Sequence, residues 1–157
     1  MKLTDFVEPK AVIASLESTD RNGAIRELVE ALCKAGSLPE GDCESISKAI
    51  IARENQGSTG FGKGVAVPHV KHPKVPRIMC AIGRSEAGID FSALDRAPVY
   101  TVVVLASPPE NPDGHLQAME CIFRHLQRDN FRKFLRQAQT PDAIIELIRE
   151  ADEGGLG

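Results

Sequence analysis

The chain has 157 residues, of which 42% are hydrophobic and 26% charged, a size and composition typical of one globular domain with a proper core. Its 19 Lys and Arg residues against 22 Asp and Glu residues give a net charge of −3 without any basic block, so the chain lacks the footprint of a nucleic-acid-binding surface. Aromatic residues make up only 4%, with no Trp, which also argues against platforms for stacking bases.

The first half of the chain predicts one strand and two helices before a glycine-rich segment. Val12–Leu16 is expected to form a strand, and Thr19 or Asp20 can cap a helix whose apolar residues recur at helical spacing. A second helix is expected from about Asp42 to Glu54. Four glycines in nine residues make Gln56–Gly64 a loop whose backbone can come close to a ligand.

The second half predicts three strands and then three helices. Strands are expected at Val65–Val67, Ile78–Ile82 and Val99–Leu105. The last is almost continuously apolar, as expected for a central strand covered on both faces. After a Pro-rich loop, the helical patterns are a stripe from Leu116 to Leu126, a short piece at Phe131–Gln137, and a last helix that starts at Thr140-Pro141.

Strands that alternate with helices indicate an α/β fold. No helix intervenes between Val65 and Ile82 or between Ile82 and Val99, so the chain can reverse direction there. The sheet is therefore expected to be mixed rather than purely parallel. The expected organisation is a single domain over residues 1–152, followed by a frayed C-terminal tail over residues 153–157.

The N-terminal residues carry no apolar signal segment, and the longest apolar run, Val102–Ala106, is too short to cross a bilayer. A cytoplasmic protein without direct membrane insertion is expected. The four cysteines are Cys33, Cys43, Cys80 and Cys121, and none forms a C-x-x-C pair. Because each lies among apolar residues, the sequence predicts reduced, buried thiols rather than disulfides.

Two histidines are candidates for chemistry because they follow the ends of predicted strands. His69 follows Val65–Val67, and His115 opens a helix just beyond the central strand, so both could lie at one edge of the sheet. A helix N-terminus there can hold an anion such as phosphate, and it keeps a nearby histidine neutral and nucleophilic. The glycine-rich loop is not a nucleotide-binding Walker A motif, because Gly64 follows Lys63.

These residues carry a resemblance to a known family. The segments Arg53-Glu54, Gly57-Ser58-Thr59-Gly60 and Gly64-Val65-Ala66-Val67-Pro68-His69 resemble the signature of the enzyme IIA domain of the bacterial phosphotransferase system, in its fructose/mannitol/nitrogen-regulatory class. His115-Leu116, after the Pro-rich loop, is similar to the family's second element. The likeness extends over about Leu3 to Arg149. One departure is Val70, where the family commonly has glycine and a positive φ would be costly for valine.

The resemblance implies a mixed β-sheet flanked by helices on both faces, and a phosphotransferase component that carries a phosphohistidine. His69 would accept the phosphoryl group, His115 would stabilise it, and Arg53 would lie beside it. Ser58, Thr59 and Gly60 would form a phosphate loop. The donor would be an HPr-type phosphocarrier protein, in its sugar or nitrogen branch, and the recipient a IIB domain or a regulatory target protein. Transfer between two histidines requires no metal, nucleotide or other cofactor.

Two alternatives stay open at this point. The domain could be a regulatory binding module, without a role in transport, whose partner affinity depends on phosphorylation. More remotely, His69, His72 and His115 could supply three imidazoles to a metal ion such as zinc.

Overall fold

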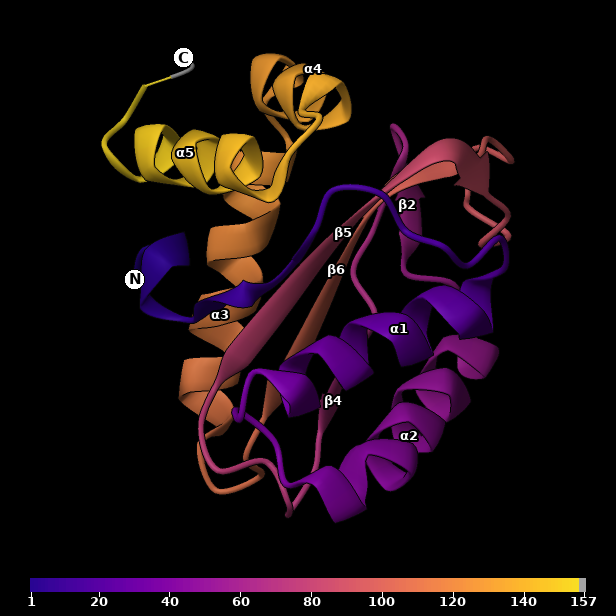
Figure 1. Ribbon diagram of the computed structural model, residues 1–157, viewed down its shortest axis with the longest axis vertical. Coiled ribbons are helices and arrows are strands. Elements are labelled where there is room, and N and C mark those ends of the chain that lie inside the picture. The colour runs from indigo at the N-terminus through magenta and orange to yellow at the C-terminus, as the bar shows by residue number, and fades with distance from the viewer. Residues whose placement is uncertain (156–157) are drawn as a thin grey trace.

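The most apolar run of the chain forms β6 (Val99–Ser107), the strand around which the fold is built. In the computed structural model, which describes residues 1–155, β6 lies inside a six-stranded sheet (Figure 1). Five strands follow the order β1-β5-β6-β3-β2, and the sixth, β4, pairs with the C-terminal end of β6. The other strands are β1 (Val7–Ile13), β2 (Gly60–Gly62), β3 (Val65–Ala66), β4 (His69–Lys71) and β5 (Met79–Ile89).

The sheet is mixed, as expected. β1 runs parallel to β5, while β3 and β4 both run parallel to β6. β5 and β6 are antiparallel, which confirms the predicted reversal between Ile82 and Val99. The other predicted reversal also occurs, but β3 and β5 are not neighbours, because β6 lies between them.

Helices cover both faces of this sheet (Figure 1). α1 (Arg21–Lys34) and α2 (Cys43–Gln56) pack on one face, and α3 (Pro112–Leu126), α4 (Asp129–Gln137) and α5 (Pro141–Asp152) pack on the other. Two short 3₁₀ helices, Leu3–Asp5 and Glu40–Asp42, precede β1 and α2. The single α/β fold with helices on both faces is confirmed. Within the described residues, no helix is both long enough and apolar enough to cross a membrane.

The alternation of side chains along β6 explains why this strand is apolar throughout. Val103 and Leu105 lie in the core beneath α3, α4 and α5, whereas Val102 and Val104 lie in the core beneath α1 and α2. All four are buried. Since burying one such side chain contributes roughly 1.5–3 kcal/mol, a polar residue at any of these positions would weaken one of the two cores.

Side-chain caps fix the starts of three helices. Asp20 accepts a hydrogen bond from the Gly23 N–H at 2.6 Å, and Thr140 accepts one from Ala143 at 3.1 Å. Asn111 caps α3 by accepting from the Gly114 N–H at 3.1 Å. Proline occupies the first turn of α3 and α5, where its missing N–H costs no helical hydrogen bond.

Several predicted boundaries were wrong. β1 starts and ends earlier than Val12–Leu16, and β5 continues to Ile89, well past Ile82. β4 was not predicted at all, since three residues carry too little pattern. The predicted domain limit at residue 152 coincides with the end of α5. The division into a domain and a tail stays a prediction, and residues 156–157 of that tail lie outside the described residues.

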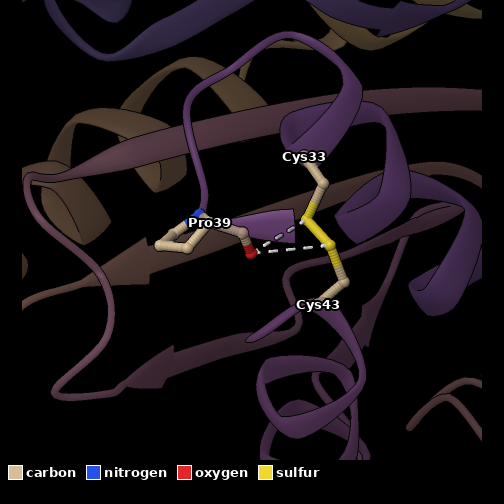
Figure 2. Close-up of a disulfide and its surroundings, with 3 residues drawn as sticks. All are labelled: Cys33, Pro39 and Cys43. Atoms are coloured by element: carbon tan, nitrogen blue, oxygen red, sulfur yellow. Dashed lines mark hydrogen bonds between the residues drawn. A yellow bond between two sulfur atoms is a disulfide. The ribbon is translucent and has the colours of Figure 1, made fainter. Parts of the chain in front are cut away.

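The prediction that all four cysteines are reduced was wrong for one pair. Cys33, near the end of α1, and Cys43, the first residue of α2, form a disulfide with their Cα atoms 6.5 Å apart, within the usual range (Figure 2). No sequence pattern indicates it, because the two are ten positions apart and meet only when the helices form a hairpin. Cys80 and Cys121 are free and buried, as predicted.

Candidate functional site

His69 lies at the start of β4, and β4 holds it beside the end of β6. The register pairs His69 with Leu105 and Lys71 with Ser107, the last residue of β6. The chain leaves β6 at Ser107 and returns in α3, whose fourth residue is His115. The two histidines therefore meet at one edge of the sheet, as predicted, with ring centroids 5.8 Å apart and ring planes inclined by 48°.

The ring of His69 is held in one orientation by its own backbone. Its Nδ1 lies 2.8 Å from the carbonyl oxygen of Val67. A carbonyl oxygen can only accept a hydrogen bond, so the neutral ring carries its proton on Nδ1, and this N–H donates a hydrogen bond to the Val67 carbonyl. The lone pair is then on Nε2, which has no hydrogen-bond partner within residues 1–155. Nε2 is the nitrogen available to react.

His115 is held through the same ring atom by a different partner. Its Nδ1 lies 2.8 Å from the hydroxyl oxygen of Ser107, a residue with no exposed surface. A hydroxyl can donate or accept, so Ser107 can serve either tautomer of His115. When Ser107 donates to Nδ1, the proton of the neutral ring lies on Nε2, where it can donate to an anion beside His69.

Both histidines are neutral at pH 7 in this arrangement. Burial is the main cause that lowers the pKa of His69 below 6.5, and Arg53 and Lys71 lower it further, against the Val67 carbonyl and Glu54, which raise it. Burial, followed by the nearby His69 and Lys71, lowers the pKa of His115 to about 4. His115 is thus not protonated before phosphorylation, and a phosphoryl dianion beside it would favour its charged form.

Arg53 lies in the last turn of α2, where its charge reaches the His69 ring. Its Nη1 donates to the carbonyl oxygen of Gly57 at 3.0 Å, and the side chain is half-buried. The guanidinium is therefore tied to the start of the glycine-rich loop while its remaining donors stay available. Its charge acts on the His69 ring, and its role beside a phosphoryl group stays a prediction.

Glu54 organises the loop that follows α2. It is 2% exposed, and its two carboxylate oxygens accept hydrogen bonds from the N–H and the hydroxyl of Thr59, both at 2.7 Å. The Ser58 hydroxyl donates to the Phe91 carbonyl at 2.6 Å and accepts from the Gly60 N–H at 3.0 Å. Both hydroxyl groups therefore bond to protein atoms in this structure.

Gly60 has a packing reason to be glycine. A Cβ built at this position would lie 2.9 Å from the Cβ of Ala93, closer than real Cβ contacts. Gly60 is buried in β2, and its carbonyl accepts from the Leu94 N–H at 2.9 Å. The roles predicted for Ser58, Thr59 and Gly60 as phosphate ligands stay predictions, and the contacts of all three hold the loop in place.

Glu54, Lys71 and Ser107 were missed as site residues. Glu54 adjoins Arg53 in the motif, which was the available signal. Ser107 ends the central strand just before the loop that leads to His115. Nothing in the sequence marks Lys71, whose position beside His115 depends on the pairing of β4 with β6.

The other histidines are not brought into this site. His72 Nδ1 accepts from the Lys74 N–H at 3.0 Å, which leaves Nε2–H to donate to the Ser45 hydroxyl at 3.1 Å. His125 is buried against Phe131. Over residues 1–155, no three His, Cys, Asp or Glu side chains converge as metal ligands would, so the geometry gives the three-histidine metal site no support.

Val70 is accommodated without strain. It lies within β4, paired with Ala106, and it is not among the residues of the described chain that adopt a positive φ. The family's glycine is therefore not needed here for its backbone freedom.

A cleft of about 820 Å³ lies at the opposite end of β6, lined in part by Tyr100, Thr101 and Arg136. Neither His69 nor His115 lines it. The pair of His69 and His115 at the sheet edge therefore lies outside this cleft.

Comparison with known families shows which family the chain belongs to. The family described as "Phosphoenolpyruvate-dependent sugar phosphotransferase system, EIIA 2" matches residues 5–151. The chain belongs to this family. It is a phosphotransfer component of the phosphotransferase system, in a family whose members carry phosphoryl groups in the sugar or nitrogen branch.

Relatives of this EIIA domain come from both branches. A fructose-specific EIIABC component from Bacillus subtilis (strain 168) is 36% identical over 153 residues, which are 98% of this chain and 24% of that protein. The chain thus spans about a quarter of that relative's length. A nitrogen regulatory protein from Bradyrhizobium diazoefficiens is 32% identical over 148 residues, 94% of this chain and 95% of the relative.

Solved structures share the fold. The nitrogen regulatory protein IIA-Ntr from Neisseria meningitidis superposes with a TM-score of 0.81 at 24% identity, over 92% of this chain and 97% of that one. The mannitol IIA of Escherichia coli, solved in complex with phosphorylated mannitol IIB, gives a TM-score of 0.77 at 19% identity, over 92% and 99% of the two chains. At these identities the likeness establishes the fold.

Proposed function

We propose that His69 Nε2 accepts a phosphoryl group from an HPr-type phosphocarrier and passes it to a IIB domain or holds it as a regulatory signal. The observation that carries this proposal is the 2.8 Å contact between His69 Nδ1 and the Val67 carbonyl, which leaves Nε2 as the nucleophile. The site would operate in the cytoplasm, where the donor proteins of such systems reside.

The reaction breaks one N–P bond and forms another. The Nε2 lone pair of neutral His69 attacks phosphorus in line with the N–P bond of the donor phosphohistidine, and the donor imidazole leaves with that bonding pair. His69 keeps its Nδ1 proton, so its ring gains the positive charge that the Val67 carbonyl stabilises. The reverse attack by the next acceptor empties the site in the same way.

The charge on the three phosphoryl oxygens is met by groups already in place. Arg53 brings a permanent positive charge close to His69, and His115 brings an N–H donor whose orientation Ser107 fixes. Preoriented donors of this kind stabilise developing charge without reorganisation during the reaction. Glu54, Ser58, Thr59 and Gly60 hold the loop that anchors Arg53, so they act on the phosphoryl group through that anchor.

The rim of the site is suited to a protein partner. Leu116, next to His115, exposes 59% of its surface and gives the rim a large apolar side chain. An apolar rim can exclude water around the N–P bond when a partner docks. The mannitol relative that was solved with phosphorylated IIB supports a IIB domain as one recipient.

The test is phosphotransfer followed by intact mass. The protein is incubated with enzyme I, HPr and phosphoenolpyruvate, alongside His69→Ala and the matched control His72→Gln, which removes a neighbouring histidine outside the site. We expect one phosphoryl group on the wild type and on His72→Gln and none on His69→Ala. Phosphorylation of His69→Ala to the wild-type level would contradict the proposal. So would the absence of phosphorylation on the wild-type protein with both HPr and its nitrogen-branch relative.

A regulatory role is the second candidate, because the chain matches nitrogen regulatory proteins over 95–99% of their lengths. In that role the phosphoryl group changes affinity for a target instead of moving to a IIB domain. A chase of the phosphorylated protein with a fructose-type IIB domain separates the two. Rapid loss of the phosphoryl group favours transport, and retention favours regulation.

A further inference from the structure

The disulfide joins two helices that pack on the same face of the sheet, and one of them, α2, carries site residues. Cys33 and Cys43 are half-buried, so a reagent can reach their sulfur atoms, whereas Cys80 and Cys121 are buried. Burial raises the pKa of the Cys80 and Cys121 thiols, which makes them unreactive. The two classes of cysteine in this chain are therefore chemically distinct.

We propose that Cys33 and Cys43 are a reversible redox modification site, oxidised and reduced by exchange with a small thiol–disulfide couple such as glutathione. We further infer that the disulfide braces α2 and so tunes phosphorylation at His69, a second part that rests on the proposed function. The proposed function places the protein inside the cell, where disulfides are usually transient or regulatory.

The exchange requires no reactant other than the protein and the small thiol–disulfide couple. The Cys43 thiolate attacks one sulfur of an oxidised disulfide, and the first thiol leaves. The Cys33 thiolate then attacks the mixed disulfide, the second thiol leaves, and the protein has given up two electrons and two protons. Cys43 is suited to the first attack because it is the first residue of α2, where the helix dipole favours the thiolate.

Both redox states fit the surrounding structure. The carbonyl oxygen of Pro39 lies 4.0 Å from Cys33 Sγ and 3.9 Å from Cys43 Sγ (Figure 2). A disulfide sulfur has no proton to donate, but either thiol of the reduced pair could donate a weak hydrogen bond to this oxygen. The helices also stay packed through fully buried residues such as Leu32 and Ile46, so reduction does not require unfolding.

α2 carries the disulfide at its start and also contacts the chain segments that precede and follow His69. Near its start, Ser45 contacts His72, which follows β4, at 3.1 Å. In its last turn, Arg53 and Glu54 hold the glycine-rich loop and influence His69. Cys43 and Arg53 are ten residues apart, about 15 Å along a continuous helix. A covalent brace at the first turn therefore restricts the element that positions the site.

The modification itself is tested without any phosphoryl donor. The native protein is equilibrated in glutathione buffers of graded potential, alkylated, and measured by intact mass, with Cys33→Ser/Cys43→Ser as control. We expect a single transition in which two alkylation sites appear together, and none in the double variant. The proposal is overturned if the pair stays reduced under oxidised glutathione, or if the disulfide forms only between chains.

The coupling to the site is read by hydrogen exchange and thermal unfolding of the two redox forms. We expect slower exchange in the oxidised form along α2 and the loop at 57–60, and a melting temperature higher by about 5–10 °C. The Cys33→Ser/Cys43→Ser variant should show neither difference. Equal exchange at Arg53 and in the loop in both forms would refute the coupling even if the disulfide forms.

Phosphorylation is compared last, at equal protein concentration, in the oxidised and reduced forms. We expect the oxidised form to be phosphorylated at least about two-fold faster, the range in which mutations along a connecting element shift coupling. Equal rates would overturn the tuning of phosphotransfer. Because the alkylation and exchange measurements need no phosphoryl donor, they would still decide whether the redox site exists if the phosphotransfer proposal failed.

Discussion

His69 and His115 are both held through Nδ1, His69 by the Val67 carbonyl and His115 by the Ser107 hydroxyl, each at 2.8 Å. With ring centroids 5.8 Å apart, the two imidazoles leave Nε2 as the free nitrogen on each ring. The Val67 carbonyl can only accept a hydrogen bond, whereas the Ser107 hydroxyl can accept or donate one. This difference fits the proposed roles of His69 as the nucleophile and His115 as the donor.

The orientation of His115 should depend on Ser107. We expect His115→Ala to slow phosphorylation of His69 by about 10²-fold, as when one oriented donor is lost, and Ser107→Ala to slow it by roughly ten-fold or less. Single-turnover transfer from phospho-HPr measures both rates. A His115→Ala rate equal to the wild type would remove His115 from the mechanism.

Glu54 should contribute to stability as well as to the site, because it is buried with two hydrogen bonds to Thr59. We expect Glu54→Ala to lower the free energy of unfolding by about 2–3 kcal/mol, since the Thr59 donors lose a charged partner. Urea unfolding measures this. The matched control is Glu30→Ala, an exposed position on α1, which should change stability by less than about 0.5 kcal/mol.

Two glycines of the loop should respond differently to alanine. Gly60→Ala places a methyl group 2.9 Å from the Ala93 Cβ, so we expect a loss of about 1–3 kcal/mol. Gly57 has an extended backbone and open space around it, so Gly57→Ala should be nearly neutral. Equal melting temperatures for the two variants would show that the loop does not pack on Ala93.

Stability should fall as the pH drops through the range set by the two site histidines. The folded pKa of His115 is about 4 and that of His69 is also lowered, whereas both titrate near 6.5 in the unfolded chain. Below pH 6.5 the unfolded chain therefore binds protons at these histidines that the folded chain does not, so their contribution to stability is lost from pH 6.5 down to about 4 and is fully present above that range.

The check is the loss of unfolding free energy between pH 7.5 and pH 5 in the wild type and in His115→Gln. Removing the imidazole should make this loss smaller. An unchanged loss would mean that His115 is not held neutral by burial.

The sequence predicted those elements whose pattern is local. The apolar run of β6 and the caps of α1 and α5 each depend on a few neighbouring residues. β4 could not be found that way, because His69–Lys71 becomes a strand only through its pairing with β6. The disulfide likewise depends on two helices meeting, and residue spacing alone does not encode that meeting.

The sequence likewise indicated only those site residues that a local pattern marks. His69 and His115 lie at the shared sheet edge that the sequence suggested, because each follows the end of a strand, and Arg53 lies in the last turn of α2. Glu54, Lys71 and Ser107 were missed because their contacts depend on the loop fold and on the register of β4. The sequence also gives no sign of the burial that keeps His115 neutral, because that burial depends on how α3 packs at the sheet edge.

The central claim is that the phosphoryl group attaches to Nε2 of His69. The most direct measurement is ³¹P-coupled NMR of the phosphorylated protein, with selective labelling of the histidine rings. We expect spin coupling between phosphorus and Nε2 of His69. We also expect Nδ1 to remain protonated and hydrogen-bonded to the Val67 carbonyl. Attachment at Nδ1 of His69, or at any other histidine, would contradict the claim.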